Sequence, residues 1–194
     1  MGFANGIRSM MRQDPDIILV GEIRDTETAE MAFSAAMTGH QVYSTLHTNS
    51  AIGAVPRLLD IGILPDIMAG NIIGIVAQRL IRKLCVHCKQ EVLADDMERQ
   101  LLGIKKEEAA TRIYRAVGCA HCAHQGYKGR MSILEILKID GELDDLIARR
   151  ATQRELRKAA IASGFRPLVE DAVRRVLEGL TTLDEISRVA DLTD

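Results

Sequence analysis

Aromatic residues are scarce in this chain of 194 residues, which has three tyrosines, three phenylalanines and no tryptophan. Neither sign of charge dominates, because 25 lysines and arginines oppose 27 aspartates and glutamates, for a formal net charge of −2. Proteins that hold nucleic acids use basic surfaces and aromatic side chains that stack on bases. We therefore expect no nucleic-acid partner, and no global basic field that would hold an anionic membrane.

Long apolar runs are also missing. No stretch approaches the roughly 18–20 apolar residues that a membrane-spanning helix needs, and residues 1–6 lack the basic and apolar regions of a signal peptide. We expect a cytoplasmic protein. The chain is nevertheless 47% hydrophobic, which suits one large or two small domains with a real core.

The first part of the chain alternates between strand and helix patterns. Residues 17–20, Ile-Ile-Leu-Val, form a short β-branched run that is typical of a strand covered on both faces. Asp25 or Thr26 can cap a following helix that ends at Gly39, and residues 41–46 have the pattern of a second strand. A strand, a helix and a strand in about thirty residues predict a βαβ unit, so we expect an α/β fold with a parallel sheet.

Polar residues follow both predicted strands. Glu22 comes after the first strand and His47 after the second, so a parallel sheet brings them to one edge, where ligands bind in such folds. An apolar strand that delivers a carboxylate is the layout of the Walker B element of P-loop ATPases, where it orients water and helps arrange Mg²⁺. The same pattern also arises by chance, and a single histidine in a polar loop is more often solvated or structural.

The four cysteines form two Cys-x-x-Cys pairs, Cys85/Cys88 and Cys119/Cys122. In a reducing compartment this spacing favours thiolate metal ligands over disulfides. Four thiolates suit a structural, tetrahedral Zn²⁺ site, and the roughly thirty intervening residues predict a small inserted subdomain. One alternative is four unliganded thiols. Another is a histidine in place of a sulfur, for which the candidates are His87, His121 and His124.

The periodicity changes from alternating strands and helices over the first eighty residues to a purely helical pattern in the last fifty, and the cysteines lie between them. We expect three domains, which cover residues 1–84, 85–137 and 138–194. The last of these reads as three or four short helices. Two Thr-x-x-Glu sequences, at 152–155 and 182–185, match the capping box that begins many helices. We therefore expect a helical domain at the end of the chain.

A series of motifs runs through the chain in a fixed order: Arg-Gln-Asp-Pro-Asp at 12–16, Ile-Leu-Val-Gly-Glu-Ile-Arg-Asp at 18–25, Thr-Gly-His at 38–40, Ser-Thr-Leu-His-Thr-Asn at 44–49, Ala-Gln-Arg-Leu at 77–80, the two cysteine pairs, and Gly-Leu-Thr-Thr-Leu-Asp-Glu at 179–185. Together these motifs resemble the secretion ATPases that drive type II protein secretion and type IV pilus assembly. The resemblance covers nearly the whole chain, and the type II branch looks the nearer.

The resemblance implies a partial RecA-like P-loop domain, a tetracysteine zinc subdomain and a helical C-terminal domain. It implies ATP, Mg²⁺ and Zn²⁺ as cofactors, with Glu22 as the catalytic carboxylate and His47 at the phosphate end of the nucleotide. It further implies a homohexamer that acts on an inner-membrane platform protein and is peripheral to that membrane through its partners. Residues that it places near the nucleotide and Mg²⁺ are Gly21, Arg24, Asp25, Gln78 and Arg79.

One departure from the family pattern bears on activity. The chain contains no Gly-Lys dipeptide, so the phosphate loop G-x-x-x-x-G-K-[ST] that cradles the nucleotide is missing. We expect this chain to be the C-terminal part of a longer ATPase and to be inactive alone. The alternatives are a stand-alone zinc-binding interaction module derived from such an ATPase, and a nucleic-acid-binding zinc ribbon, which the low aromatic content disfavours.

Overall fold

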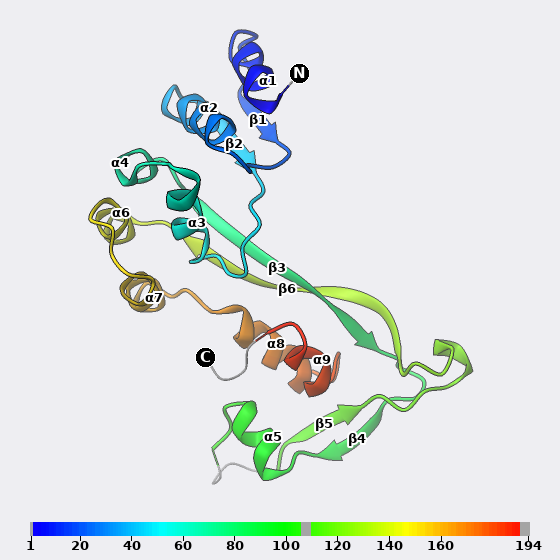
Figure 1. Ribbon diagram of the computed structural model, residues 1–194. Coiled ribbons are helices and arrows are strands. Elements are labelled where there is room, and N and C mark those ends of the chain that lie inside the picture. Colours follow the sequence, from blue (N-terminus) through cyan, green and yellow to red (C-terminus); the bar gives the residue numbers. More distant parts are fainter. Residues whose placement is uncertain (1, 106–109, 191–194) are drawn as a thin grey trace. The chain divides into compact units, whose positions relative to one another are not determined.

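The computed structural model describes residues 2–105 and 110–190 (Figure 1). The chain forms two compact units, one built from Met1–Ala77 with Ile136–Phe165 and the other from Gln78–Glu135 with Arg166–Asp194. The division into three domains at 84 and 137 stays a prediction. Residues 106–109 and 191–194, which belong to the second and third predicted domains, lie outside the described residues.

The first unit contains the predicted βαβ unit. Strands β1 (Ile17–Val20) and β2 (Gln41–Ser44) pair in parallel, with Ile17 opposite Gln41, and helix α2 (Thr26–Met37) connects them. Asp25 caps α2 by accepting a hydrogen bond from the backbone N–H of Thr28 at 2.8 Å. The α/β fold expected from the alternating pattern is therefore confirmed. The other helices of this unit are α1 (Phe3–Met10), α3 (Ala54–Ile61), α4 (Pro65–Met68), α6 (Gly141–Ala148) and α7 (Gln153–Ala162).

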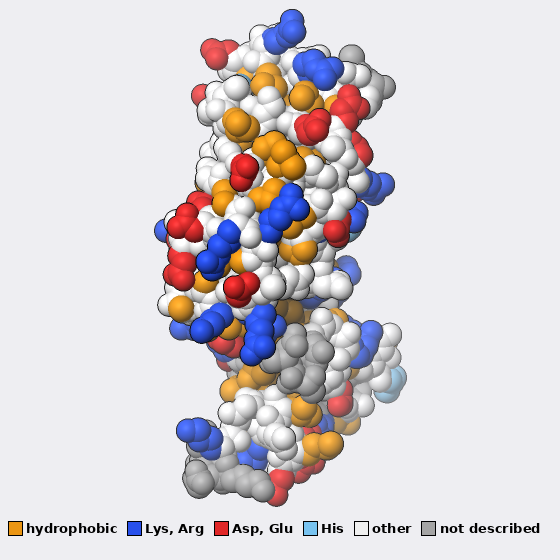
Figure 2. All heavy atoms as spheres, turned by 60° about the vertical axis from the view of Figure 1, so that its left-hand side comes forward, with side chains coloured by type: hydrophobic (Ala, Val, Ile, Leu, Met, Phe, Trp, Pro, Cys, Tyr) orange, Lys and Arg blue, Asp and Glu red, His pale blue; other side chains and the backbone are white. Residues whose placement is uncertain are grey.

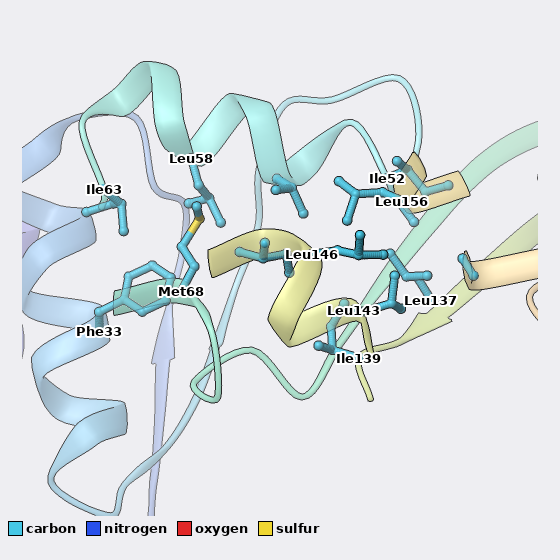
Figure 3. Packing of buried hydrophobic residues seen from close by; sticks show 14 of the residues in the cluster. Phe33, Ile52, Leu58, Ile63, Met68, Leu137, Ile139, Leu143, Leu146 and Leu156 are labelled. Atoms are coloured by element: carbon cyan, nitrogen blue, oxygen red, sulfur yellow. The ribbon is translucent and has the colours of Figure 1, made fainter. Parts of the chain in front are cut away.

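The main core of this unit lies where α2, α3, α4, α6 and α7 meet (Figure 3). Phe33 of α2, Leu58 of α3, Met68 of α4 and Leu143 of α6 all contribute buried side chains. Pro56 lies in the first turn of α3, where a backbone N–H has no partner within the helix, so the proline is accommodated at little cost.

Within its described residues, the second unit contains a β-hairpin-like pair, a 3₁₀ turn and three helices. Strands β4 (Gln90–Leu93) and β5 (Arg112–Arg115) form an antiparallel pair, and helix α5 (Asp96–Leu101) lies between them in the sequence. A short 3₁₀ turn, η1 (Ala120–Cys122), and helices α8 (Leu168–Leu177) and α9 (Leu183–Ser187) complete it. Its core includes Ile81, Ile113, Ile133, Val176 and Ile186.

Two long strands, β3 (Gly74–Leu84) and β6 (Tyr127–Lys138), are hydrogen-bonded to each other and have residues in both units. On the face shown in Figure 2, apolar side chains are spread among charged side chains of both signs. Among the described residues, each helix is too short or too polar to cross a bilayer.

Candidate functional site

The carboxyl ends of β1 and β2 bring two distant segments together. Beyond the strands, the backbone N–H of Ile23 donates to the carbonyl of Thr45 at 3.0 Å. The Thr45 hydroxyl donates to the carbonyl of Gly21 at 2.7 Å. These two bonds continue the strand pairing into the loops, so Glu22 and His47 lie at the same edge of the sheet, as the strand order predicts.

Glu22 is the centre of this edge. Its Oε2 accepts a hydrogen bond from Nε of Arg24 at 2.6 Å and lies 3.2 Å from Nε2 of His47. The Glu22 side chain is 23% exposed, whereas those of Arg24 and His47 are 67% and 75% exposed. Because a carboxylate only accepts, this contact is a hydrogen bond when Nε2 of His47 carries a proton. In this arrangement the shielded carboxylate can accept a proton from a water molecule. The two exposed nitrogen donors can form hydrogen bonds to an anion.

Two other residues that the resemblance places near the nucleotide have structural contacts of their own. The Asp25 carboxylate accepts from the Thr28 hydroxyl at 3.0 Å as well as from the Thr28 backbone, so it begins helix α2. Gly21 provides the carbonyl that Thr45 binds. A nucleotide role for Asp25 and Gly21 stays a prediction.

Gln78 and Arg79 are consecutive residues of β3 and belong to the second unit. Gln78 is exposed and Arg79 is half-buried. Their predicted place near the nucleotide is not tested by the geometry of the first unit, and it stays a prediction.

The four cysteines of the second unit form one cluster. Their Sγ atoms all lie within 4.8 Å of one another. The Sγ–Sγ distance is 3.9 Å for Cys85 and Cys119, and 3.8 Å both for Cys88 and Cys122 and for Cys119 and Cys122. Four sulfurs at about 2.3 Å from a tetrahedral ion are about 3.8 Å apart, whereas a disulfide needs about 2.05 Å. The positions therefore fit Zn²⁺ and do not fit disulfides.

Backbone amides point at two of the sulfurs. The N–H groups of Cys119 and Gly126 donate to Sγ of Cys122 at 3.2 Å each, and that of Gly118 donates to Sγ of Cys88 at 3.3 Å. Burial raises the pKa of Cys122, but hydrogen bonds from the amides of Cys119 and Gly126 and from the thiols of Cys88 and Cys119 together outweigh it and bring the pKa down to about 6. Burial raises the pKa of Cys88 to about 12. Thiolate ligands must be deprotonated, so the amides favour the metal-binding form of Cys122.

Histidines lie beside this cluster without joining it. The rings of His87 and His121 stack with their centroids 4.2 Å apart, and both residues are exposed. Among the described residues, the clustered ligand atoms are the four sulfurs alone. The geometry thus favours four cysteine ligands over the alternative with a histidine.

Sequence reasoning missed a third set of polar residues, around Glu185. The pattern indicated only a capping box there, and Thr182 does cap α9. The Glu185 side chain, however, is buried and binds the guanidinium of Arg82, 103 residues earlier in the chain. One feature of the sequence could have indicated this buried ion pair. Glu185 lies between Leu183 and Ile186 on a short helix, and both of these apolar residues are buried.

Comparison with known proteins identifies the family. A family model described as "Type II/IV secretion system protein" matches residues 1–188. The chain is 47% identical over 190 residues to Type II secretion system protein E of Pseudomonas aeruginosa, covering 97% of this chain and 37% of that protein. It is also 47% identical over 196 residues to the type IV pilus assembly ATPase TfpB of Acinetobacter baylyi, covering 100% of this chain and 33% of that protein.

Solved structures agree with this assignment. The crystal structure of the pilus retraction motor PilT with bound ADP matches with a TM-score of 0.67 and 26% identity, covering 98% of this chain and 44% of PilT. The chain spans 33–37% of the length of the two curated relatives described above. With this fold, and with a sequence match along nearly its whole length, the chain belongs to the family of type II/IV secretion system proteins.

Proposed function

We propose that this chain is the C-terminal part of a hexameric ATPase that powers type II protein secretion or type IV pilus assembly. The names of the relatives, a type II secretion protein and a pilus assembly ATPase, support this proposal. The observation that carries it is the contact between Glu22 and His47 at the carboxyl ends of two parallel strands, the position at which such sheets bind ligands.

In this proposal Glu22 is the catalytic carboxylate. Arg24 and His47 both contact Oε2, so the other oxygen, Oε1, is assigned to the attacking water and takes its proton. His47 and Arg24 are exposed enough to turn towards the terminal phosphate as negative charge develops there. When bound, Mg²⁺ neutralises phosphate charge, and catalysis of this kind is mostly positioning and electrostatic stabilisation.

The proposal gives the four cysteines a structural role. The tetrahedral spacing of their sulfurs supports a Zn²⁺ site with no open position for substrate or water. Bonds from both cysteine pairs to one ion would join two segments that lie 34 residues apart in the chain. Much of the binding energy of such a site is folding energy for the segments it joins.

The remaining roles come from the family alone. In a full-length protein, hydrolysis in a cytoplasmic hexamer would be passed as a conformational stroke to an inner-membrane platform protein. The ATPase would thus be peripheral to the membrane through its partner. No nucleic acid takes part in this scheme.

A comparison of this chain with a full-length parent that carries a phosphate loop tests the proposal. We expect the chain alone neither to bind a nonhydrolysable ATP analogue with Mg²⁺ tightly in calorimetry nor to release phosphate from ATP, because it has no Gly-Lys sequence to hold the γ-phosphate. The parent should do both. Micromolar binding by the chain alone, with turnover that Glu22→Gln abolishes, would contradict the assignment of phosphate binding to the missing loop.

A second candidate function is a stand-alone zinc-binding interaction module without hydrolytic activity. The missing Gly-Lys sequence favours it. The DNA upstream of the coding segment distinguishes the two candidates: an in-frame phosphate loop supports the ATPase, and its absence supports the module.

A further inference from the structure

The turn between α8 and α9, residues Gly179–Thr182, is bound to the strand that leads into the first cysteine pair. The backbone N–H of Leu84 donates to the carbonyl of Leu180 at 2.8 Å. The Thr181 hydroxyl donates to the carbonyl of Arg82 at 2.9 Å, and Thr181 is fully buried. Leu84 directly precedes Cys85, so the turn is attached next to a sulfur ligand.

A lysine next to the first cysteine pair holds the start of the same turn. Lys89 follows Cys88, and its Nζ donates to the carbonyl of Gly179 at 2.8 Å while lying 4.3 Å from the centre of the Tyr114 ring. Gly179 has a φ of +67°, and a Cβ atom there would lie 2.5 Å from that ring. Only glycine fits between the lysine and the tyrosine at this position.

The end of the turn is fixed by the strand that leaves the second cysteine pair. The Tyr127 hydroxyl lies 2.7 Å from the Thr182 hydroxyl, and the same ring lies 4.1 Å beneath the guanidinium of Arg82. Arg82 also donates its backbone N–H and its Nε to the Glu185 carboxylate at 3.0 and 2.8 Å. The helix that follows the turn is thus anchored to the same two strands.

Backbone hydrogen bonds connect the segments that carry these anchoring residues to the cysteine cluster. The backbone N–H of Cys85 donates to the carbonyl of Gly126, one residue before Tyr127, at 2.9 Å. The N–H of Lys89 donates to the carbonyl of Cys85 at 3.0 Å. A metal bound by all four sulfurs therefore fixes Leu84, Lys89 and Tyr127 relative to one another.

From these contacts we infer that the tetracysteine centre is a metal-dependent clamp on the α8–α9 turn, with Lys89 as a positioning residue. The inference rests on the zinc site of the proposed function and goes beyond it, because it assigns the metal an effect on helices outside the cysteine subdomain. Linkage requires the effect to be mutual: if zinc favours the docked turn by some factor, the docked turn favours zinc binding by the same factor.

Hydrogen exchange of the full chain tests the clamp. After a high-affinity chelator removes zinc, the amides of residues 180–188 should exchange about tenfold faster or more, the change expected for loss of one hydrogen bond to a charged donor. The amides of α6 and α7, which belong to the other unit, should exchange as before. Unchanged exchange at 180–188 after zinc removal overturns the clamp and leaves the zinc site standing. Absence of zinc from the purified protein overturns both.

A variant that leaves the cysteines intact separates the clamp from general unfolding. Lys89→Met should keep one zinc per chain and should speed hydrogen exchange at residues 180–188. Its zinc affinity, measured in competition with a coloured chelator, should fall by about the same factor as the exchange rate rises. Lys83→Met, at an exposed position near the end of β3, is the matched control and should change neither quantity. Thr181→Val should act in the same direction as Lys89→Met. Zinc affinity and exchange equal to the control in both variants would overturn the clamp.

Discussion

Nε2 of His47 lies 3.2 Å from Oε2 of Glu22, although 25 residues separate them in the sequence. The contact exists because β1 and β2 are parallel neighbours in register, so their carboxyl ends coincide. The same carboxylate oxygen binds Arg24, the second residue after Glu22. One acid is thus held by a neighbour in sequence and by a neighbour across the sheet.

In a full-length parent, Glu22→Gln should leave nucleotide binding nearly intact and lower turnover by roughly 10² to 10⁴, the usual contribution of a general base. The amide keeps the shape of the carboxylate but cannot take a proton from water. Phosphate release and nucleotide titration measure the two effects. Glu30→Gln, on the exposed side of α2, is the control. If Glu22→Gln hydrolyses ATP at the wild-type rate, Glu22 is a surface residue at the end of a strand and has no catalytic role.

Protein purified without chelator should contain one zinc per chain, because the four sulfurs already have tetrahedral spacing. The double variant Cys85→Ser/Cys119→Ser, which removes one ligand from each pair, should contain almost none. Elemental analysis measures both. A zinc content well below one in the wild-type chain, or equal content in the variant, would rule out this site.

Glu185→Gln should lower the free energy of unfolding by about 1.5–3 kcal/mol at pH 7, the usual effect of losing hydrogen bonds to a buried charged group. Burial raises the pKa of Glu185, but hydrogen bonds from the side chain and backbone of Arg82 outweigh it and hold the pKa below its usual value. Because the pKa of Glu185 is lower in the folded chain, its ionised carboxylate stabilises the fold at pH values above its usual pKa of 4.5. This contribution is lost as the pH falls through the lowered pKa.

The difference between wild type and Glu185→Gln should therefore shrink between pH 7 and pH 3. Urea unfolding at both pH values measures it. Glu178→Gln, whose carboxylate is exposed, should cost less than about 0.5 kcal/mol at either pH. A difference that is the same at both pH values would show that the ionised form of Glu185 is not what stabilises the fold.

Leu19→Lys should reduce self-association of the chain. Within the described residues β1 pairs only with β2, and Ile17 and Leu19 on its outer face are 58% and 74% exposed. Next to them, an apolar hollow of about 240 Å³ is lined by Phe3, Met10 and Leu19 among others. Exposed apolar strands promote association, and a lysine opposes it.

Sedimentation of the chain over a range of concentrations measures this effect. Leu64→Lys introduces the same charge at a leucine that is 55% exposed and not in β1, and it should leave association unchanged. Equal association of wild type and Leu19→Lys would show that the outer face of β1 is not a contact surface.

The elements with strong local patterns were predictable. The run of four apolar residues became β1, and Asp25 caps α2 as one of the two predicted candidates. The capping box of Thr152 and Glu155 forms as predicted, with each side chain accepting a hydrogen bond from the backbone N–H of the other residue. Strands β4 and β5 were not predicted, because both are short and only Ile113 among their residues is fully buried, so the alternation that marks a strand is faint.

The sequence by itself determined the family, the α/β class, the four cysteines as one candidate set of metal ligands, and the residue types at the sheet edge. Each of these follows from a short local pattern or from a fixed order of motifs. Only the tertiary structure decided which partners the charged groups take. Thr182 and Glu185 have the same spacing as Thr152 and Glu155, yet the Glu185 carboxylate binds Arg82, 103 residues earlier, as well as Arg188 at the end of its own helix. Spacing reports on neighbours within a helical turn, whereas the partner of a buried charge depends on which strand the helix packs against.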